Sequence, residues 1–311
     1  MTEDNIKTGS LKAWVLAARP KTLTGAAVPV MIGLALAWDV LLGPDSNNIL
    51  RPGALSGADA LIVSVLCLLF AFFMQIDANF INDYFDFMKG NDDETRLGPK
   101  RACMMGWVHA RQMRQAILLT TLFACLVGLP LAFYGGVEMI LVGVVCVVFC
   151  FLYTTHLSYW GMGDVLVLLF FGLIPVCVPY YILLRQLSLE VFVASVACGL
   201  VIDTLLMINN YRDIENDIRA GKITLAVRMG KAGSRMAYLA LGFGACLLGV
   251  VYALNGHLWA FVLPLAYLVF HVKTYRRMKA IDHGRELNLI LGETARNMFI
   301  YGLSVSVGIL L

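Results

Sequence analysis

The chain has 311 residues, of which 59% are apolar and only 14% are charged, and its mean hydropathy is +0.77. This composition excludes a water-soluble globular protein and predicts a single membrane-embedded domain over residues 1–311, built from apolar spans of about 20 residues. With 24 Lys and Arg against 21 Asp and Glu, the net charge of +3 gives no indication of a nucleic-acid partner. The eight cysteines show no spacing typical of a zinc site or a disulfide framework.

Residues 1–21 are expected to form an interfacial segment. Basic residues interrupt its apolar residues, so it lacks the continuous apolar centre of a signal peptide. We expect a short amphipathic helix that turns Trp14 and Leu16 toward lipid and ends at Pro20.

Nine apolar runs follow and predict an all-α integral membrane protein with nine transmembrane helices. Of the 24 Lys and Arg residues, all except Arg51 and Arg185 lie in the N-terminal segment or after the second, sixth and eighth runs. Because basic residues are retained on the cytoplasmic side, we expect a cytoplasmic N-terminus and an outer C-terminus. The runs cover residues 22–42, 60–81, 116–134, 137–155, 165–184, 191–210, 236–254, 258–272 and 295–311.

Carboxylates collect at the cytoplasmic ends of two of these runs, within residues 79–86 and 209–217. If the helices continue into the connections, Asn79, Asp83 and Asp86 share one face at i, i+4 and i+7. Asp213 and Asp217 form an i, i+4 pair on the second helix. We therefore expect the connections at about 82–115 and 211–235 to carry the active site.

The two stretches also match each other. Asn82, Tyr84 and Asp86 align with Asn209, Tyr211 and Asp213 at a constant offset of 127 residues. Four spans separate them, so a parallel internal repeat would bring the two stripes face to face. Carboxylates about 6 Å apart repel by about 3 kcal/mol per pair at an effective dielectric constant near 20. Asp and Asn oxygens without Cys or His favour Mg²⁺ as the compensating ion.

Basic residues accompany the acids, and the combination is typical of a pyrophosphate site: the acids hold the metal, the metal bridges phosphate oxygens, and the bases neutralise the leaving group. Two alternatives remain open. Both connections could be merely solvated, or the acids could belong to a divalent cation transporter, although transporter acids should lie near the bilayer midplane. The bases in question are Arg19, Lys21, Lys89, Arg96, Arg212, Arg219 and Lys222.

The stripes resemble the signature of the UbiA superfamily of intramembrane aromatic prenyltransferases. Asn82-Asp83-Tyr84-Phe85-Asp86 is similar to its first motif, N-D-x-x-D-x-x-x-D, and Asp213-x-x-x-Asp217 is similar to its second. The third aspartate of the first motif would fall at Gly90, and Asp92 could replace it. The resemblance implies helices around a central cavity, Mg²⁺ dependence and a polyprenyl diphosphate donor.

This resemblance implies a set of site residues. We expect Asp83, Asp86, Asp213 and Asp217 to hold the metal, with Asn82 and Asp92, and Lys222 to take part in catalysis. Substrate contacts are expected from Asn79, Asn82, Lys89, Arg96, Asn209, Asn210, Arg212, Tyr153, Arg19 and Lys21. Aromatic faces stabilise an allylic cation, and the candidates are Tyr84, Phe85, Tyr153 and Tyr211.

Longer strings resemble the menaquinone branch of the superfamily, which prenylates 1,4-dihydroxy-2-naphthoate with loss of CO₂. They include Asn209-Asn210-x-Arg212-Asp213, residues 220–228 and Gly161-Met162-Gly163-Asp164. The resemblance implies an aromatic acceptor, a lipid bilayer around the protein and a bacterial cytoplasmic membrane with the active site facing the cytoplasm. Branches that use 4-hydroxybenzoate or haem as acceptor remain alternatives.

Three further polar residues have no assigned role. Asp77 and Asp203 lie within spans, where an aspartate costs roughly 2.5 to 3.5 kcal/mol. Asp203 shares a helix face with Asn210, so it either lines a cavity or makes a structural hydrogen bond. His156 either contacts the acceptor or is an ordinary loop histidine.

Overall fold

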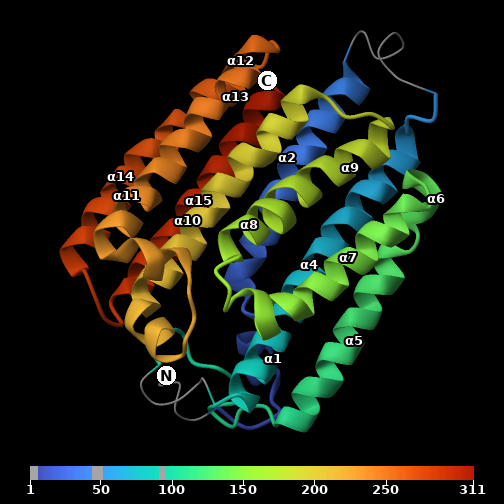
Figure 1. The fold of residues 1–311 in the computed structure, drawn as a ribbon. Helices are drawn as coiled ribbons and strands as arrows, with labels where there is room; N and C mark the ends of the chain where they lie inside the picture. The colour runs from blue at the N-terminus through green and yellow to red at the C-terminus, as the bar shows by residue number, and fades with distance from the viewer. Residues whose placement is uncertain (1–5, 44–51, 91–95) are drawn as a thin grey trace.

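A computed structural model describes residues 6–43, 52–90 and 96–311, which form a bundle of helices without any strand in these ranges (Figure 1). The α-helices are α1 (Leu11–Ala18), α2 (Leu23–Leu42), α4 (Gly57–Met88), α5 (Ala110–Gly128), α6 (Leu131–Gly135), α7 (Glu138–Leu152), α8 (Gly163–Val167), α9 (Ile174–Leu184), α10 (Leu189–Arg219), α11 (Leu225–Leu248), α12 (Val250–Leu254), α13 (Leu258–Val262), α14 (Leu265–Ile281) and α15 (Leu287–Ile309). A 3₁₀ turn, η2 (Pro20–Thr22), and two π-helical turns, η3 (Tyr153–Leu157) and η4 (Leu168–Leu173), join them.

Proline and glycine explain where the helices break and how closely they pack. Pro130 precedes α6 and Pro264 precedes α14, because proline cannot continue a helix without losing a hydrogen bond. A Cβ atom on Gly33 of α2 would lie 2.2 Å from the carbonyl oxygen of Val176 in α9. Gly172 of η4 meets Gly199 of α10 in the same manner, since a Cβ atom on Gly172 would lie 3.0 Å from the Gly199 Cα. Small residues thus set the closest helix contacts, as is usual in membrane bundles.

The basic connections gather at one end of the bundle. Figure 1 shows α1 at this end, together with the α4–α5, α10–α11 and α14–α15 connections, and it shows the C-terminus at the opposite end near α12 and α13. The long helices α4 and α10 run to this end as continuous helices of 32 and 31 residues, so each carries its Asn/Asp stripe within regular helix.

Among the described residues, eight helical segments are long and apolar enough to cross a membrane, which confirms the all-helical membrane class. They cover Leu11–Leu42, Gly57–Met88, Ala110–Gly135, Glu138–Leu157, Gly163–Leu184, Leu189–Arg219, Leu225–Leu254 and Leu258–Ile281. The ninth predicted run overlaps α15 up to Ile309, and the 23 residues of this helix include Glu293, Arg296 and Asn297. The count of nine spans and the orientation of the termini stay predictions.

The N-terminal helix α1 forms as expected, but its predicted lipid-facing side is wrong. The Trp14 ring packs edge-on against Phe80 of α4 with ring centroids 5.8 Å apart, and Leu16 is half-buried against the same cluster. The exposed apolar residues are Leu11 and Val15. Tertiary packing on α4 therefore covers the side that the sequence pattern assigned to lipid.

Candidate active site

One large cavity of about 1360 Å³ runs through the bundle and joins a polar end to apolar walls. The polar end takes its lining from α4, α10, the α1–α2 junction and the connections after α4 and α10. The walls take theirs mainly from α2, α7, η4, α9 and α15. The polar lining residues include Arg19, Lys21, Asn82, Asp86, Arg96, Lys100, Arg101, Tyr153, Asn209, Asn210, Asp213, Asp217 and Lys222.

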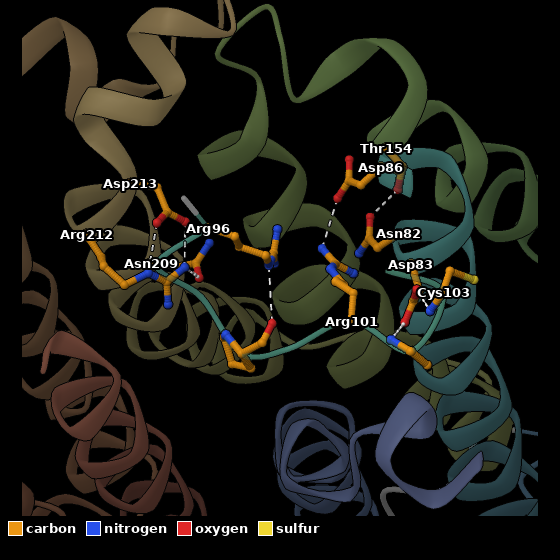
Figure 2. Close-up of polar contacts among 12 residues, drawn as sticks. Asn82, Asp83, Asp86, Arg96, Arg101, Cys103, Thr154, Asn209, Arg212 and Asp213 are labelled. Carbon is orange, nitrogen blue, oxygen red and sulfur yellow. Dashed lines mark hydrogen bonds and ion pairs between the residues drawn. The ribbon is translucent and has the colours of Figure 1, made fainter. Parts of the chain in front are cut away.

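The first stripe reaches the cavity through Asn82 and Asp86, which are one helix turn apart on α4. Asp86 Oδ2 accepts a hydrogen bond from Arg101 Nη2 at 2.9 Å, and both side chains are nearly buried. Asn82 Oδ1 accepts a hydrogen bond from the Thr154 hydroxyl of η3 (Figure 2). Both residues therefore sit where the connection after α4 meets η3.

Asn79 and Asp83 do not share this cavity face, which corrects the predicted alignment of Asn79, Asp83 and Asp86. Asp83 is buried, and its two oxygens accept hydrogen bonds from the backbone amides of Ala102 at 2.8 Å and Cys103 at 2.9 Å (Figure 2). Asn79 Nδ2 donates to Ala18 O and to Thr22 Oγ1 at the α1–α2 junction. A helix period fixes which residues share a face but not which face points inward. Asn79 and Asp83 thus lie on the neighbouring face of α4 and hold the segments around the site.

The second stripe is ordered by Arg212, which is buried and lies outside the cavity lining. Its Nε lies 2.8 Å from Asp213 Oδ1, its Nη2 lies 2.8 Å from Asn209 Oδ1, and its Nη1 lies 2.8 Å from Asn288 Oδ1 of α15. Asn288 Nδ2 in turn donates to Leu97 O at 2.7 Å. Arg212 therefore joins α10 to α15 directly, and through Asn288 to the connection between α4 and α5. It also orients Asp213, which does line the cavity.

The connection between α4 and α5 packs tightly around Gly98. A Cβ atom there would lie 3.0 Å from Arg212 Nη2 and 3.2 Å from Arg96 Nη2. Arg96 Nε donates to Pro99 O at 3.2 Å, which bends the connection back on itself. This compact turn presents Arg96, Lys100 and Arg101 to the cavity from a single short segment.

Two lysines flank the ring of Tyr159 on the other side of the polar end. Lys89 Nζ lies 4.5 Å from the ring centroid and donates to Thr155 O at 2.9 Å, outside the cavity lining. Lys222 Nζ lies 5.0 Å from the same ring and does line the cavity. Asp217 interacts electrostatically with Lys222, Asp213 and Asp86, so the two stripes share one charged environment.

The oxygen donors of this end fit a hard divalent cation. Asp86, Asp213 and Asp217 offer carboxylates, and three amides offer carbonyl oxygens, from Asn82, Asn209 and Asn210. Within the described ranges, no three His, Cys, Asp or Glu side chains are close enough to hold a metal ion by themselves. Mg²⁺ commonly binds through one or two carboxylates plus substrate phosphates. The residues therefore fit Mg²⁺ bound together with a diphosphate. Asp92 lies outside the described residues.

The aromatic residues of the cavity differ from those expected. Only Tyr153 of the predicted set lines it, whereas Tyr84 and Phe85 pack against each other and the Tyr211 hydroxyl donates to Asp282 Oδ1 at 2.9 Å. The rings that line the walls are Phe70, Phe149, Phe170, Phe171 and Phe299, and those of Phe149 and Phe170 lie 5.2 Å apart. With aromatics at 11% of the chain, no sequence signal separates these five from the rest.

Several other polar residues are now placed. His156 is exposed and outside the cavity lining, so the structure does not bring it to the site. Asp77 accepts hydrogen bonds from Thr120 and Thr121 of α5, so its carboxylate joins α4 to α5. The cavity lining also includes Lys100, Arg101, Asn288 and Arg296, to which sequence reasoning gave no role. The density of bases in residues 96–101 was the only available signal for the first two.

At the polar end of the bundle, Asp282 links three elements beside the cavity. The Tyr211 hydroxyl and the cations of Lys231 and Arg235 hold the pKa of Asp282 below its ordinary value. These contacts join α10 and α11 to the connection before α15, so they support the wall that carries Arg212 and Asn288.

Residues 26–303 match the UbiA prenyltransferase family. The chain is 31% identical to the 1,4-dihydroxy-2-naphthoate octaprenyltransferase of Haemophilus influenzae over 97% of this chain and 96% of that protein. It is 33% identical to the enzyme of the same name from Escherichia coli over 86% of this chain and 84% of that protein.

Solved structures share the fold at low sequence identity. The apo structure of a UbiA homologue from Aeropyrum pernix covers 94% of this chain and 98% of its own, with a TM-score of 0.67 and 15% identity. A UbiA homologue from Archaeoglobus fulgidus bound to DMAPP and Mg²⁺ covers 94% of this chain and 99% of its own, with a TM-score of 0.57 and 15% identity.

Proposed function

Because the chain belongs to the UbiA prenyltransferase family, we propose that it transfers a polyprenyl group from an allylic diphosphate to 1,4-dihydroxy-2-naphthoate with loss of CO₂. The observation that carries this proposal is the pair of stripes, Asn82/Asp86 on α4 and Asn209/Asp213 on α10, at the charged end of a long apolar cavity. A diphosphate fits the charged end and an isoprenoid chain fits the apolar walls. The names of the relatives support the naphthoate acceptor.

The metal would be Mg²⁺, held by Asp86, Asp213 and Asp217 with the amide oxygens of Asn82 and Asn209. The positive charge of the bound Mg²⁺ would stabilise the negative charge that accumulates on the departing diphosphate. The Archaeoglobus fulgidus homologue bound to DMAPP and Mg²⁺ supports a site that takes a prenyl diphosphate together with Mg²⁺.

The basic residues bind and neutralise the diphosphate from two sides. Arg96, Lys100 and Arg101 approach from the connection after α4, and Lys222 approaches from the connection after α10. Preorganised cations of this kind stabilise a leaving group in the transition state more than in the ground state. Arg212 acts on Asp213, which it holds in place, and not on the substrate.

The walls of the cavity protect the allylic cation. The rings that line it, including those of Phe149 and Phe170, offer π faces to positive charge. The same apolar walls exclude water, which would otherwise capture the cation. These are the conditions under which an electron-rich naphthol ring, and not water, attacks the prenyl carbon.

The proposed setting is a bacterial cytoplasmic membrane with nine spans, a cytoplasmic N-terminus and a cytoplasmic active site. The segregation of all but two of the Lys and Arg residues supports it. An odd number of spans also agrees with Figure 1, in which α1 and the C-terminus lie at opposite ends of the bundle. We take residues 1–311 as one prenyltransferase domain.

The experiment is a product analysis with purified protein, Mg²⁺, prenyl diphosphates of different lengths, and 1,4-dihydroxy-2-naphthoate beside 4-hydroxybenzoate. Prenylated naphthoquinol as the main product is expected, with no turnover once EDTA removes the metal. Good turnover of 4-hydroxybenzoate without naphthoate turnover would assign the chain to another branch of the family. Mg²⁺ transport by vesicles containing the protein, without any transfer, would support the transporter alternative.

A further inference from the structure

A second pair of carboxyl groups lies beside the cavity, separate from the two stripes. Asp164 stands in the first turn of α8 and lines the cavity. Asp203 lies in the middle of α10, seven residues before Asn210, which is about 10 Å along the helix. Helix α8 packs directly on α10, where a Cβ atom on Gly163 would lie 3.2 Å from Leu206 Cδ2. Asp164 therefore lies in the wall of the cavity, deeper than the site proposed for the diphosphate, and Asp203 is buried on α10 outside the lining.

Both carboxyl groups have a buried oxygen without a partner. Asp203 is only 3% exposed, and within the described ranges neither its Oδ1 nor Asp164 Oδ1 has a hydrogen-bond partner. Asp77 provides a contrast, because it is equally buried on α4 but accepts hydrogen bonds from two threonines. Buried carboxyl oxygens are nearly always satisfied, so the unpartnered oxygen of Asp164 in the cavity lining, with that of Asp203 behind it, points to a hydrogen-bond donor that arrives with the substrate.

The surroundings of the pair favour a hydroxyl donor. Asp164 and Asp203 interact electrostatically with each other, and no Lys, Arg or His is among the groups that act on Asp203. The facing titratable group is Tyr153 of η3, which interacts with both carboxyl groups and whose hydroxyl would lie 3.9 Å from a Cβ atom on Gly163. Repulsion between two neighbouring carboxylates in a poorly solvated place favours a state in which the pair holds one proton. It can therefore accept one proton and later return it.

We propose that Asp164, with Asp203 as its proton-sharing partner, accepts and returns the proton of the hydroxyl group next to the reacting carbon of the aromatic acceptor. This inference rests on the proposed function and adds residues that neither stripe contains. Asp164 is the catalytic residue because it faces the cavity, and Asp203 is the positioning residue behind it.

The proton balance of the reaction agrees with such a pair. The ring carbon that bears the carboxylate bonds to the allylic carbon, while the carbon–oxygen bond to the diphosphate breaks and its electrons leave with the diphosphate. The neighbouring hydroxyl becomes a carbonyl as its proton passes to Asp164. When the carbon–carboxylate bond then breaks and CO₂ leaves, its electrons restore the aromatic ring and the oxygen recovers the proton from Asp164. No proton is gained or lost overall.

The test compares wild-type protein with Asp164→Asn and Asp203→Asn, and with Asp77→Asn as the matched buried control. The acceptors are 1,4-dihydroxy-2-naphthoate and its methyl ether at the hydroxyl next to the carboxylate-bearing carbon. Asp164→Asn should lower kcat with the free hydroxyl at least 10²-fold, the scale of a lost general base. Asp203→Asn should lower it less, and Asp77→Asn should stay within about twofold of wild type. With the ether, which has no proton to transfer, all four proteins should turn over at the same slow rate.

Binding of geranyl diphosphate with Mg²⁺ separates this inference from the proposed function. Unchanged geranyl diphosphate affinity in both variants, together with a solvent deuterium isotope effect that wild type shows and Asp164→Asn lacks, supports the proton-transfer role. Equal losses with both acceptors, or variants as active as wild type, would overturn it. A rate that depends on Na⁺ or K⁺ in wild type but not in the variants would also overturn it, by assigning the pair to a bound cation. Failure of wild type to prenylate the naphthoate would instead refute the proposed function.

Discussion

Arg101 reaches across the cavity mouth to Asp86, with its Nη2 2.9 Å from Asp86 Oδ2 (Figure 2). The two residues come from different elements, since Asp86 is near the end of α4 and Arg101 follows in the connection to α5. Asp83 fixes this geometry by accepting hydrogen bonds from the two backbone amides that follow Arg101. The first motif therefore contains one aspartate that lines the cavity and one that holds the backbone next to the arginine.

This division of roles gives the first prediction. Asp86→Asn, Asp213→Asn and Asp217→Asn should each lower kcat at least 10²-fold, because each removes charge that stabilises the departing diphosphate through the metal. Asp83→Asn should instead lower the melting temperature, because it weakens two buried charge-assisted hydrogen bonds, and leave a larger residual activity per folded molecule. Steady-state kinetics and thermal unfolding in the same detergent check this. Equal kinetic losses at saturating Mg²⁺ for Asp83→Asn and Asp86→Asn would contradict the assignment.

The second prediction concerns Arg101. Arg101→Gln should raise the KM of the donor about tenfold, since a charge-assisted hydrogen bond contributes about 1.5 to 3 kcal/mol. The KM of the acceptor should change little. The check is a kinetic series in which each substrate is varied at saturating levels of the other. A defect confined to the acceptor would place Arg101 in the other half of the site.

Gly98 provides a test of the packed basic connection. Gly98→Ala places a Cβ atom 3.0 Å from Arg212 Nη2, and overpacking of this kind typically costs about 1 to 3 kcal/mol. The turn should shift, and the donor KM should rise as Arg96, Lys100 and Arg101 move. Gly244→Ala on α11 is the control, because its Cβ atom meets only Leu200 Cδ1 at 3.6 Å, an ordinary contact. Wild-type donor KM in Gly98→Ala would show that the turn tolerates the methyl group.

At the opposite end of the bundle, His257 predicts a dependence of stability on pH. Its Nδ1 lies 2.8 Å from Glu190 Oε1 of α10 and its Nε2 lies 3.0 Å from Asp39 Oδ2 of α2. The hydrogen bond to Glu190 is the main cause that raises the pKa of His257 from 6.5 to about 9. Because the folded-state pKa is raised, the contribution to stability is complete below the unfolded-state pKa of 6.5 and disappears as the pH rises through about 9.

The measurement is the melting temperature between pH 6 and pH 10 for wild type and His257→Gln. The difference between the two proteins should be largest at the acid end and vanish above the folded-state pKa. A difference that grows with increasing pH would contradict the ion-pair account of this contact.

The sequence predicts the helices well because apolar length is a local property, and in the described part of the chain the first eight predicted runs overlap the eight segments that could cross a membrane. The structure places Asn82, Asp86, Asn209 and Asp213, which match each other across the two stretches, in the cavity lining, and their roles in binding stay predictions. The same spacing could not decide whether the face with Asp83 or the face with Asn82 points inward, because Asp86 is compatible with both. That choice depends on where the connection after α4 packs.

Residues joined across long sequence separations could not be predicted. Asn288 matters because it bonds both Arg212 and the carbonyl oxygen of Leu97, which lie far from it in the chain. Phe149 and Phe170 become cavity residues only through the way α7 faces η4 across the cavity. Such roles depend on tertiary packing, which a single sequence pattern does not contain.

Prenylation of 1,4-dihydroxy-2-naphthoate at the carbon that bears its carboxylate can be followed through the carboxyl group itself. The measurement uses naphthoate labelled with ¹⁴C in the carboxyl group, together with a polyprenyl diphosphate and Mg²⁺. We expect ¹⁴CO₂ to be released in a one-to-one ratio with prenylated product, and Asp86→Asn to abolish both. Label retained in the prenylated product would contradict this expectation.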